Sequence, residues 1–251
     1  MSINEKPIFV LVPGAWHTAD GFDVVRDLLQ KRGFESVAVA TPSVGSTDIK
    51  TGLYADIGYT RGIIYDLVAK GRKVIIVGHS YGGSVSSGAA EGLGWAERSK
   101  NGLSGGVISV VWLSAFVTQK GQVNLDLLGG NWLPWMLPND DGYIYSSQQE
   151  AIFYHDMTAE EQQSAISKLL PQPRRCFLEP ITYESWHDIP SFFIFCDQDA
   201  ALPLPFQEAF AAILKNPGTF HIESSHSPFF SVPEKVVEGL EQAEKHAQEN
   251  I

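Results

Sequence analysis

Short runs of β-branched and aromatic residues alternate along the chain with longer segments in which apolar residues recur at helical spacing. Each short run is almost continuously apolar, as expected for a parallel strand whose two faces are both covered by helices. The longer segments carry apolar residues three or four positions apart, which is typical of helices with one buried face. The pattern predicts six strands, at residues 8–12, 36–40, 73–77, 107–112, 191–195 and 219–222.

This alternation predicts an α/β fold, with a doubly wound, mostly parallel sheet of about six strands and helices on both of its faces. It is interrupted at residues 118–187, where no strong strand pattern occurs and aromatic residues accumulate. A segment of that length is too long for an unstructured loop in a compact domain. We therefore expect residues 1–117 and 188–251 to form the core, and residues 118–187 to form a helical cap.

Two helices have start signals of the capping-box type, in which a hydroxyl residue is followed three positions later by glutamate. Thr158 and Glu161 mark the start of a predicted cap helix at residues 159–170. Ser231 and Glu234 have the same spacing before the final segment of the chain. Each pair predicts a helix whose first backbone N–H groups are satisfied by side chains.

The strongest chemical signal is Gly-His-Ser-Tyr-Gly at residues 78–82, a G-x-S-x-G sequence between a predicted strand and a segment of small residues. A serine on a sharp strand-to-helix turn has a strained backbone, and glycines two positions away leave room for it. The turn exposes the hydroxyl above the sheet. Ser80 is therefore the predicted nucleophile, and the alternative is a glycine-rich turn that only packs the helix on the strand.

A serine nucleophile needs a base and an orienting acid, and in this arrangement the chain order is serine, acid, histidine. His226 follows the last predicted strand and alone among the seven histidines has the expected position. Asp197 and Asp199 both follow the preceding strand, so the residues alone leave the acid open between them. A surface histidine and a solvated turn carboxylate are the alternatives.

An acyl-transfer enzyme also needs donors for the tetrahedral oxyanion. The backbone N–H of Tyr81 is one candidate, and that of Ala15, in the loop after the first strand, is the other. The alternative for that loop is a plain β-to-α turn. Aromatic residues of this loop and of the cap are candidates for an apolar substrate pocket, although cap aromatics also build a cap's own core. These pocket candidates are Trp16, Trp132, Trp135 and Phe153.

The composition argues against several kinds of partner and site. The 251 residues are 44% apolar and have a formal net charge of −11. This charge repels nucleic-acid phosphates and anionic lipids, so neither a nucleic acid nor a membrane is an expected partner. No run approaches the ~20 apolar residues that cross a bilayer. The apolar run at residues 8–12 is short and lacks a basic flank, so an export signal is not expected. Cys176 and Cys196 lack the spacing of a metal site and are expected to be reduced, in a cytoplasmic protein.

These motifs together resemble the α/β-hydrolase superfamily, and within it the branch of plant methyl-ester esterases, hydroxynitrile lyases and related microbial esterases. The resemblance covers most of the chain, from residues 14–17 through the serine motif to residues 196–203 and His226. In this branch the acid stands three residues after a cysteine and four before a proline, which implies Asp199. Pro13 replaces the histidine that the branch commonly carries, so a hydrogen bond that anchors the loop is expected to be lost.

Two further positions bear on the reaction. Hydroxynitrile lyases that resemble this chain carry a lysine directly after the catalytic histidine, where this chain has Ser227, and tend to have threonine at the position of Gly14. The resemblance therefore favours hydrolysis over cyanohydrin cleavage.

The combined prediction is a serine hydrolase that cleaves a carboxylic ester or lactone of an apolar or aromatic small molecule through an acyl-enzyme. No metal or organic cofactor is expected. The alternatives are a lyase, cyclase or acyltransferase that uses the same site on a biosynthetic intermediate, and a catalytically silent small-molecule binding protein. The sequence does not identify the natural substrate, and it leaves the oligomeric state open, a homodimer included.

Overall fold

The computed structural model describes residues 6–251, and its centre is a six-stranded sheet in the order β2-β1-β3-β4-β8-β9. All adjacent strands are parallel. Residues 1–5, part of the expected core and of the polar N-terminus, lie outside the described residues. The six predicted strands are confirmed, as β1 (Ile8–Val12), β2 (Ser36–Ala38), β3 (Lys73–His79), β4 (Gly106–Leu113), β8 (Ser191–Cys196) and β9 (Gly218–Ile222).

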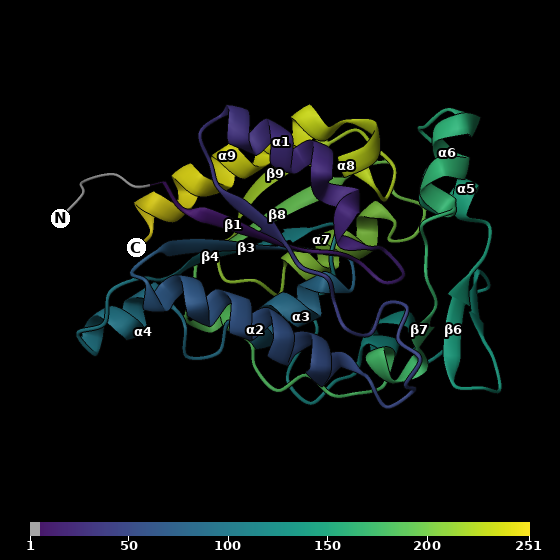
Figure 1. The fold of residues 1–251 in the computed structure, drawn as a ribbon, viewed down its shortest axis with the longest axis horizontal. Coiled ribbons are helices and arrows are strands. Elements are labelled where there is room, and N and C mark those ends of the chain that lie inside the picture. Colours follow the sequence, from purple (N-terminus) through teal and green to yellow (C-terminus); the bar gives the residue numbers. More distant parts are fainter. Residues whose placement is uncertain (1–5) are drawn as a thin grey trace.

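Helices cover both faces of this sheet (Figure 1). One face packs against α1 (Asp23–Lys31) and α9 (Pro233–Glu249), and the other against α2 (Leu53–Ala69) and α3 (Gly82–Ala89). In β1, alternate residues face opposite sides: Phe9 and Leu11 belong to the α1/α9 side, and Val10 and Val12 to the α2/α3 side. Burial of both faces explains why the strands have no polar alternation. The remaining core elements are η1 (Ala19–Phe22), α4 (Trp95–Lys100), α7 (Leu204–Ala211) and α8 (Pro228–Ser231).

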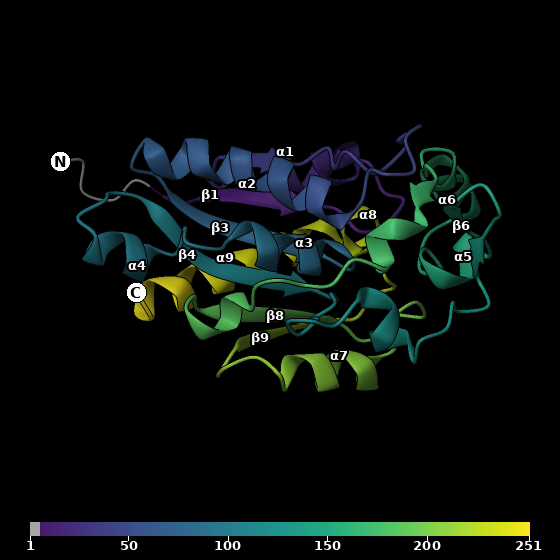
Figure 2. The same ribbon diagram turned by 90° about the horizontal axis from the view of Figure 1, so that it is seen from below.

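The connection between β4 and β8, called the cap below, lies beyond the carboxyl ends of the strands (Figure 2). It contains α5 (Gln149–Ile152), α6 (Ala159–Ile166) and the short helices η2 (Asn124–Leu128), η3 (Arg174–Phe177) and η4 (Ser185–His187). It also contains an antiparallel sheet that the sequence pattern did not indicate, because its strands are very short and two contain proline. These strands are β5 (Met136–Pro138), β6 (Tyr143–Ser146) and β7 (Gln172–Pro173).

The two predicted capping boxes have different outcomes. At α6 the box is present: the Thr158 hydroxyl accepts from the Glu161 N–H, and the Glu161 carboxylate accepts from the Thr158 N–H. At the final helix the prediction is wrong, because Val232 is the N-cap residue and makes no side-chain cap. Ser231 instead ends α8 and donates to Asp156, 2.8 Å away.

The order of the strands opens a crevice at the carboxyl edge of the sheet. Because β1 lies between β2 and β3, the chain leaves β1 toward α1 on one face and leaves β3 toward α3 on the other. Loops that diverge in this way leave room for a ligand between them. The serine motif and the loop at Ala15 are these two loops.

Candidate active site

Ser80 occupies a strained turn between β3 and α3. Its φ angle is +53°, a left-handed conformation that is unfavourable for a side chain with a Cβ atom. The flanking glycines are required by close backbone contacts: a Cβ on Gly78 would lie 2.5 Å from the Gly82 carbonyl oxygen, and one on Gly82 would lie 2.5 Å from the Val12 carbonyl oxygen. The Phe116 N–H donates to the Ser80 carbonyl at 3.1 Å and fixes the turn from the β4 side.

His226, in the loop after β9, is paired with Asp199, in the loop after β8. The His226 Nδ1 and Asp199 Oδ2 atoms are 2.6 Å apart, and the carboxylate side chain is fully buried. Since a carboxylate only accepts, Nδ1 carries the proton and the lone pair of Nε2 is left for another group. The Asp199 Oδ1 atom accepts from the N–H groups of Ala201 and Leu202 at 2.7 Å each, and Ser114 Oγ donates to Oδ2 at 2.5 Å.

The competing aspartate has a different role. Asp197 pairs with Nδ1 of His221 at 2.7 Å, and both side chains are partly exposed at the surface. Of the two candidates, Asp199 is therefore the one that contacts His226. Ser80 and His226 line the same cavity, and no hydrogen bond joins them within residues 6–251. Nucleophile-to-base hydrogen bonds of this kind commonly form only when substrate is bound.

The two predicted oxyanion donors have free N–H groups. Ala15 and Tyr81 both line the cavity that contains Ser80. In the part of the chain that the structure describes, neither backbone N–H donates a hydrogen bond. Because buried N–H groups are nearly always paired, the two unpaired ones in the cavity of Ser80 are available for a ligand oxygen.

The loop that carries Ala15 is anchored on the cap. Pro13 provides no polar side chain, and the neighbouring Trp16 has a strained φ of +65°. The Trp16 N–H donates to Gln172 Oε1 at 3.3 Å, and its indole N–H donates to the Ile144 carbonyl at 3.0 Å. The Leu170 N–H donates back to the Trp16 carbonyl at 3.0 Å. Contacts from three cap residues thus hold the loop where the related branch commonly has a histidine.

His17 is a cavity residue that the sequence analysis did not select, although it belongs to the motif at residues 14–17. Its Nδ1 lies 2.9 Å from the Ala15 carbonyl, which only accepts, so Nδ1 carries the proton. Its Nε2 then accepts from the Tyr154 hydroxyl at 2.8 Å. Burial, with a smaller contribution from nearby His226, lowers the pKa of His17 to about 4, against the opposing hydrogen bond to Ala15. The imidazole is therefore neutral at pH 7.

His79 contacts the backbone and the ring of the candidate base, His226. Its Nε2 donates to the His226 carbonyl at 2.8 Å, and the centroids of the two rings are 4.6 Å apart. Burial is the main cause that holds the pKa of His79 well below its usual value. A neutral His79 can position His226 without adding a positive charge beside it.

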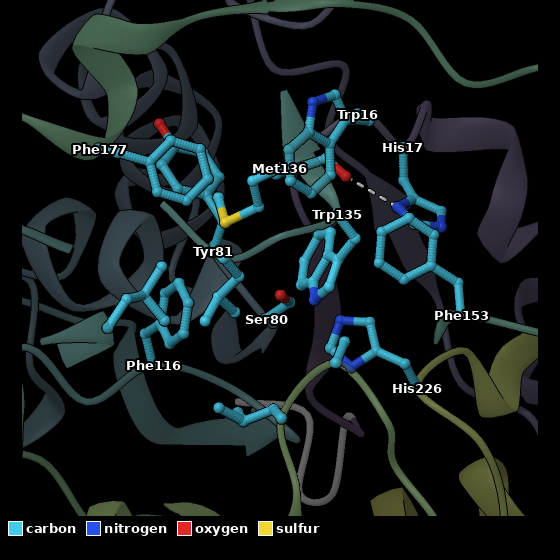
Figure 3. Close-up of a pocket in the computed structure, with 15 residues that line it drawn as sticks. Trp16, His17, Ser80, Tyr81, Phe116, Trp135, Met136, Phe153, Phe177 and His226 are labelled. Carbon is cyan, nitrogen blue, oxygen red and sulfur yellow. Dashed lines mark hydrogen bonds between the residues drawn. The ribbon is translucent and has the colours of Figure 1, made fainter. Parts of the chain in front are cut away.

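The cavity over Ser80 is lined mainly by apolar side chains (Figure 3). Three of the four predicted pocket residues line it: Trp16, Trp135 and Phe153. Trp132 lies outside the lining and packs edge-on against Phe177, with ring centroids 5.6 Å apart. The sequence did not indicate the other apolar lining residues, which are Phe116, Leu128, Leu133, Met136, Phe177, Ala201 and Leu202.

Trp135 differs from the other aromatic residues of the cavity. Its indole nitrogen points toward Ser80 and His226 (Figure 3), and it has no hydrogen-bond partner among the described residues. The indole of Trp16, by contrast, is already bonded to the Ile144 carbonyl. Trp135 is therefore an N–H donor that a bound molecule can use.

The structure also bears on other kinds of site. Across residues 6–251, no group of three or more His, Cys, Asp or Glu side chains is arranged to hold a metal ion. Within the same range, none of the helices has the length and apolar composition needed to cross a bilayer. Cys176 and Cys196 are free and buried, and burial raises the pKa of the Cys176 thiol to about 12, so this cysteine is a poor nucleophile.

Comparison with known proteins gives relatives along nearly the whole chain. "Alpha/beta hydrolase nvfD" of the fungus Aspergillus novofumigatus is 27% identical over 255 residues, which cover 97% of this chain and 99% of the relative. "Probable hydrolase R7" of Phoma sp. is 26% identical, over 92% of this chain and 95% of the relative. "Putative methylesterase 13, chloroplastic" of Arabidopsis thaliana is 26% identical over 93% of this chain, which spans 55% of that protein.

Solved structures agree with the fold. Polyneuridine aldehyde esterase superimposes with a TM-score of 0.78 at 17% identity, over 95% of this chain and 100% of that chain. A pyrethroid hydrolase from Sphingobium faniae JZ-2 has a TM-score of 0.74 at 20% identity, over 96% of this chain and 98% of that chain. The model of the alpha/beta hydrolase family matches residues 9–239, which include both diverging loops, the serine motif and the histidine loop. The chain belongs to the alpha/beta hydrolase family.

Proposed function

We propose that this protein is a serine hydrolase that cleaves a carboxylic ester or lactone of an apolar or aromatic small molecule through an acyl-enzyme. One observation carries the proposal: a single cavity contains Ser80, the imidazole of His226 with Asp199 behind it, and the two unpaired N–H groups of Ala15 and Tyr81. Acyl transfer needs each of these groups, whereas a binding protein does not need this combination.

The reaction follows from this geometry. His226 Nε2 takes the proton of Ser80 as Oγ attacks the carbonyl carbon, and Asp199 stabilises the imidazolium that forms. The carbonyl oxygen becomes an oxyanion and accepts hydrogen bonds from Ala15 and Tyr81. When the C–O bond breaks, the imidazolium returns its proton to the leaving alkoxide. The same imidazole then deprotonates a water molecule, which attacks the acyl carbon and forms a second tetrahedral intermediate. When the bond between this carbon and Ser80 Oγ breaks, the imidazolium returns the proton to Oγ and the carboxylic acid is released.

The lining of the cavity supports an apolar substrate. It includes no lysine, arginine, aspartate or glutamate, so the parts of the substrate next to the scissile bond are expected to be uncharged. The relatives named as methylesterases, an aldehyde esterase and a pyrethroid hydrolase support ester cleavage as the reaction. Ser227 after His226 supports hydrolysis, because this position carries no cationic side chain.

The test is hydrolysis of a panel of chromogenic esters with increasing acyl length, and of aromatic lactones, by wild type and Ser80→Ala. Wild type is expected to cleave the apolar members, and Ser80→Ala to lose about 10⁶-fold in kcat, as in other serine triads. Activity that survives in Ser80→Ala contradicts the proposal. A fluorophosphonate label on Ser80, located by mass spectrometry, separates the alternatives when no ester is cleaved. Labelling then indicates a lyase, cyclase or acyltransferase, and its absence indicates a binding protein.

A further inference from the structure

We propose that Gln172 and Asp56 are positioning residues of the oxyanion hole, which hold its two backbone donors at a fixed separation. The inference rests on the function proposed above, because only acyl transfer uses this hole. The donors belong to two different loops, after β1 and after β3. A continuous set of hydrogen bonds, from the Trp16 N–H through Gln172, Ser43 and Asp56 to the Tyr81 hydroxyl, joins these loops and is called the brace below.

Each contact of the brace is within hydrogen-bond distance. The Trp16 N–H donates to Gln172 Oε1 at 3.3 Å, and Gln172 Nε2 donates to Ser43 Oγ at 2.6 Å. The Ser43 hydroxyl and N–H donate to Asp56 Oδ2 and Oδ1, at 2.5 and 2.9 Å. The Tyr81 hydroxyl donates to Asp56 Oδ2 at 2.7 Å. The Gln172, Ser43 and Asp56 residues are completely buried, so no competing water is expected along this path.

The two ends of the brace are at the donors themselves. Trp16 is the residue after Ala15, and its bonded N–H is adjacent in the chain to the free N–H of Ala15. Tyr81 carries the second free N–H on its own backbone, while its side chain reaches Asp56. A displacement of either end therefore moves one donor relative to the other. Oxyanion donors stabilise the transition state best when they lie about 2.7–3.1 Å from the developing oxyanion, and they must be held within about 0.5 Å of that position.

The brace also replaces support that the loop otherwise lacks. Pro13 has no N–H and no polar side chain, and Trp16 has the strained φ of +65°. A strained residue persists only where surrounding contacts over-determine its conformation. Gln172 provides such a contact from β7 of the cap, 156 positions away in the chain.

Packing alone does not account for a carboxylate in this place. None of the ion pairs within residues 6–251 includes Asp56, and its hydrogen-bond donors are uncharged. Burial raises its pKa, and the bonds from Ser43 and Tyr81 oppose that shift. A buried carboxylate costs stability unless it is well hydrogen-bonded. The two Asp56 oxygens accept three bonds, which fix Ser43 and Tyr81 relative to each other.

The experiment compares Gln172→Leu, Ser43→Ala and Tyr81→Phe with wild type. Each variant removes one link and leaves Ser80, Asp199, His226 and both donor N–H groups in the chain. We expect kcat to fall about 10- to 100-fold, less than the 10²- to 10³-fold loss when a donor is deleted outright. KM is expected to change less than about threefold, because the bonds in question act on the transition state. The inhibition constant of an alkylboronic acid, whose adduct places an oxygen in the hole, should rise by a similar factor.

Ser87→Ala is the matched control. Ser87 is a buried serine of α3 that bonds to Ser185 and to the Tyr183 carbonyl, with no link to the brace. The Ser87→Ala variant loses a buried hydroxyl comparable to that of Ser43. Its melting temperature is therefore expected to fall about as much as that of Ser43→Ala, while its kcat stays near the wild-type value. The double variant of Gln172→Leu with Ser43→Ala should lose no more activity than the worse single variant, because both links lie in one series.

The outcomes separate this inference from the proposed function. The proposed role of the brace is wrong if the folded variants keep kcat within about twofold of wild type, or if only KM rises. Either result leaves the proposed hydrolase function unaffected. A wild-type protein that cleaves no ester and takes no label on Ser80 overturns both. Equal losses of kcat in Ser43→Ala and Ser87→Ala also overturn the brace, since a general loss of packing then explains the effect.

Discussion

Two buried aspartates each contact a residue that lines the cavity over Ser80, and they differ in the chemistry of that contact. Asp199 follows β8 and pairs with the His226 imidazole, which gains and loses a proton in the proposed reaction. Asp56 lies in α2 and accepts only from hydroxyl and backbone donors that stay neutral. Both are deeply buried and accept at least three hydrogen bonds. Burial of a carboxylate therefore does not identify a catalytic acid, and the chemistry of its partner does.

The largest expected difference between the two carboxylates is in turnover. Asp199→Asn keeps an Oδ1 acceptor for the Ala201 and Leu202 N–H groups but presents an NH₂ group to His226, which favours the wrong tautomer. We expect kcat to fall about 10⁴-fold, as in the serine-protease triad. The chromogenic ester assay measures this loss. Asp197→Asn is the matched control, because that carboxylate pairs with surface His221, and a comparable loss there would contradict the assignment of the acid.

The buried imidazole of His17 predicts a loss of stability in acid. The folded pKa of His17, about 4, lies below its unfolded value of about 6.5. Since the unfolded chain binds the proton more readily, this contribution to stability is full above pH 6.5 and is lost as the pH falls toward 4. The loss is about 3 kcal/mol in the free energy of unfolding.

Urea unfolding of wild type and His17→Gln at pH 4.5 and 7 measures this effect. The His17→Gln variant should have a flatter dependence on pH between these values. His187→Gln, which changes an exposed histidine, is the control and should keep the wild-type slope. Equal slopes in wild type and His17→Gln would show that acid sensitivity has another source.

The third expected effect is that of Asp56→Asn. The amide keeps one acceptor oxygen but cannot accept from all three donors of Ser43 and Tyr81, so we expect kcat to fall about 10- to 100-fold. The chromogenic ester assay measures this loss. A loss in Asp56→Asn as large as that in Asp199→Asn would contradict the contrast drawn between the two carboxylates.

The smallest expected effect concerns the support of Asp199. Ser114 has a strained φ of +39° at the end of β4 and donates to the same Asp199 oxygen as His226. Ser114→Ala should lower kcat about tenfold, which corresponds to roughly 1.4 kcal/mol, the usual size of one hydrogen bond to a charged group. Ser109→Ala is the control, because this buried serine of the same strand bonds only to the Pro190 carbonyl. Turnover of Ser114→Ala at the wild-type rate would show that the two backbone N–H groups hold Asp199 on their own.

The sequence was most informative where a pattern is local. The six strands are visible because both faces of the sheet are buried, so each strand is continuously apolar. The serine motif is equally local, since a sharp turn between strand and helix requires glycines at fixed spacing. The Thr158 capping box was predicted correctly for the same reason. The identical spacing at Ser231 gave a wrong prediction, because Ser231 belongs to the separate short helix α8. Its hydroxyl donates to Asp156, a residue far away in the chain.

Chain order and family resemblance extended the prediction to the candidate triad but not to its surroundings. The choice of Asp199 over Asp197 depended on the resemblance, and in the structure it is Asp199 that contacts His226. The cap was predicted as an insertion, yet its small sheet and most of the cavity lining were not. Strands of two to four residues carry too few positions for a period to be recognised.

The sequence by itself determined the α/β architecture, the serine turn and the order of the candidate catalytic residues, because each depends on periodicity or on spacing within a few residues. Only the tertiary structure decided that Trp132 is outside the cavity, that His17 is buried and neutral, and that Gln172 holds the loop at Trp16. The last two features depend on contacts between segments more than a hundred residues apart, His17 with Tyr154 and Trp16 with Gln172. No local pattern encodes such contacts, since they are set by how the cap packs over the carboxyl edge of the sheet.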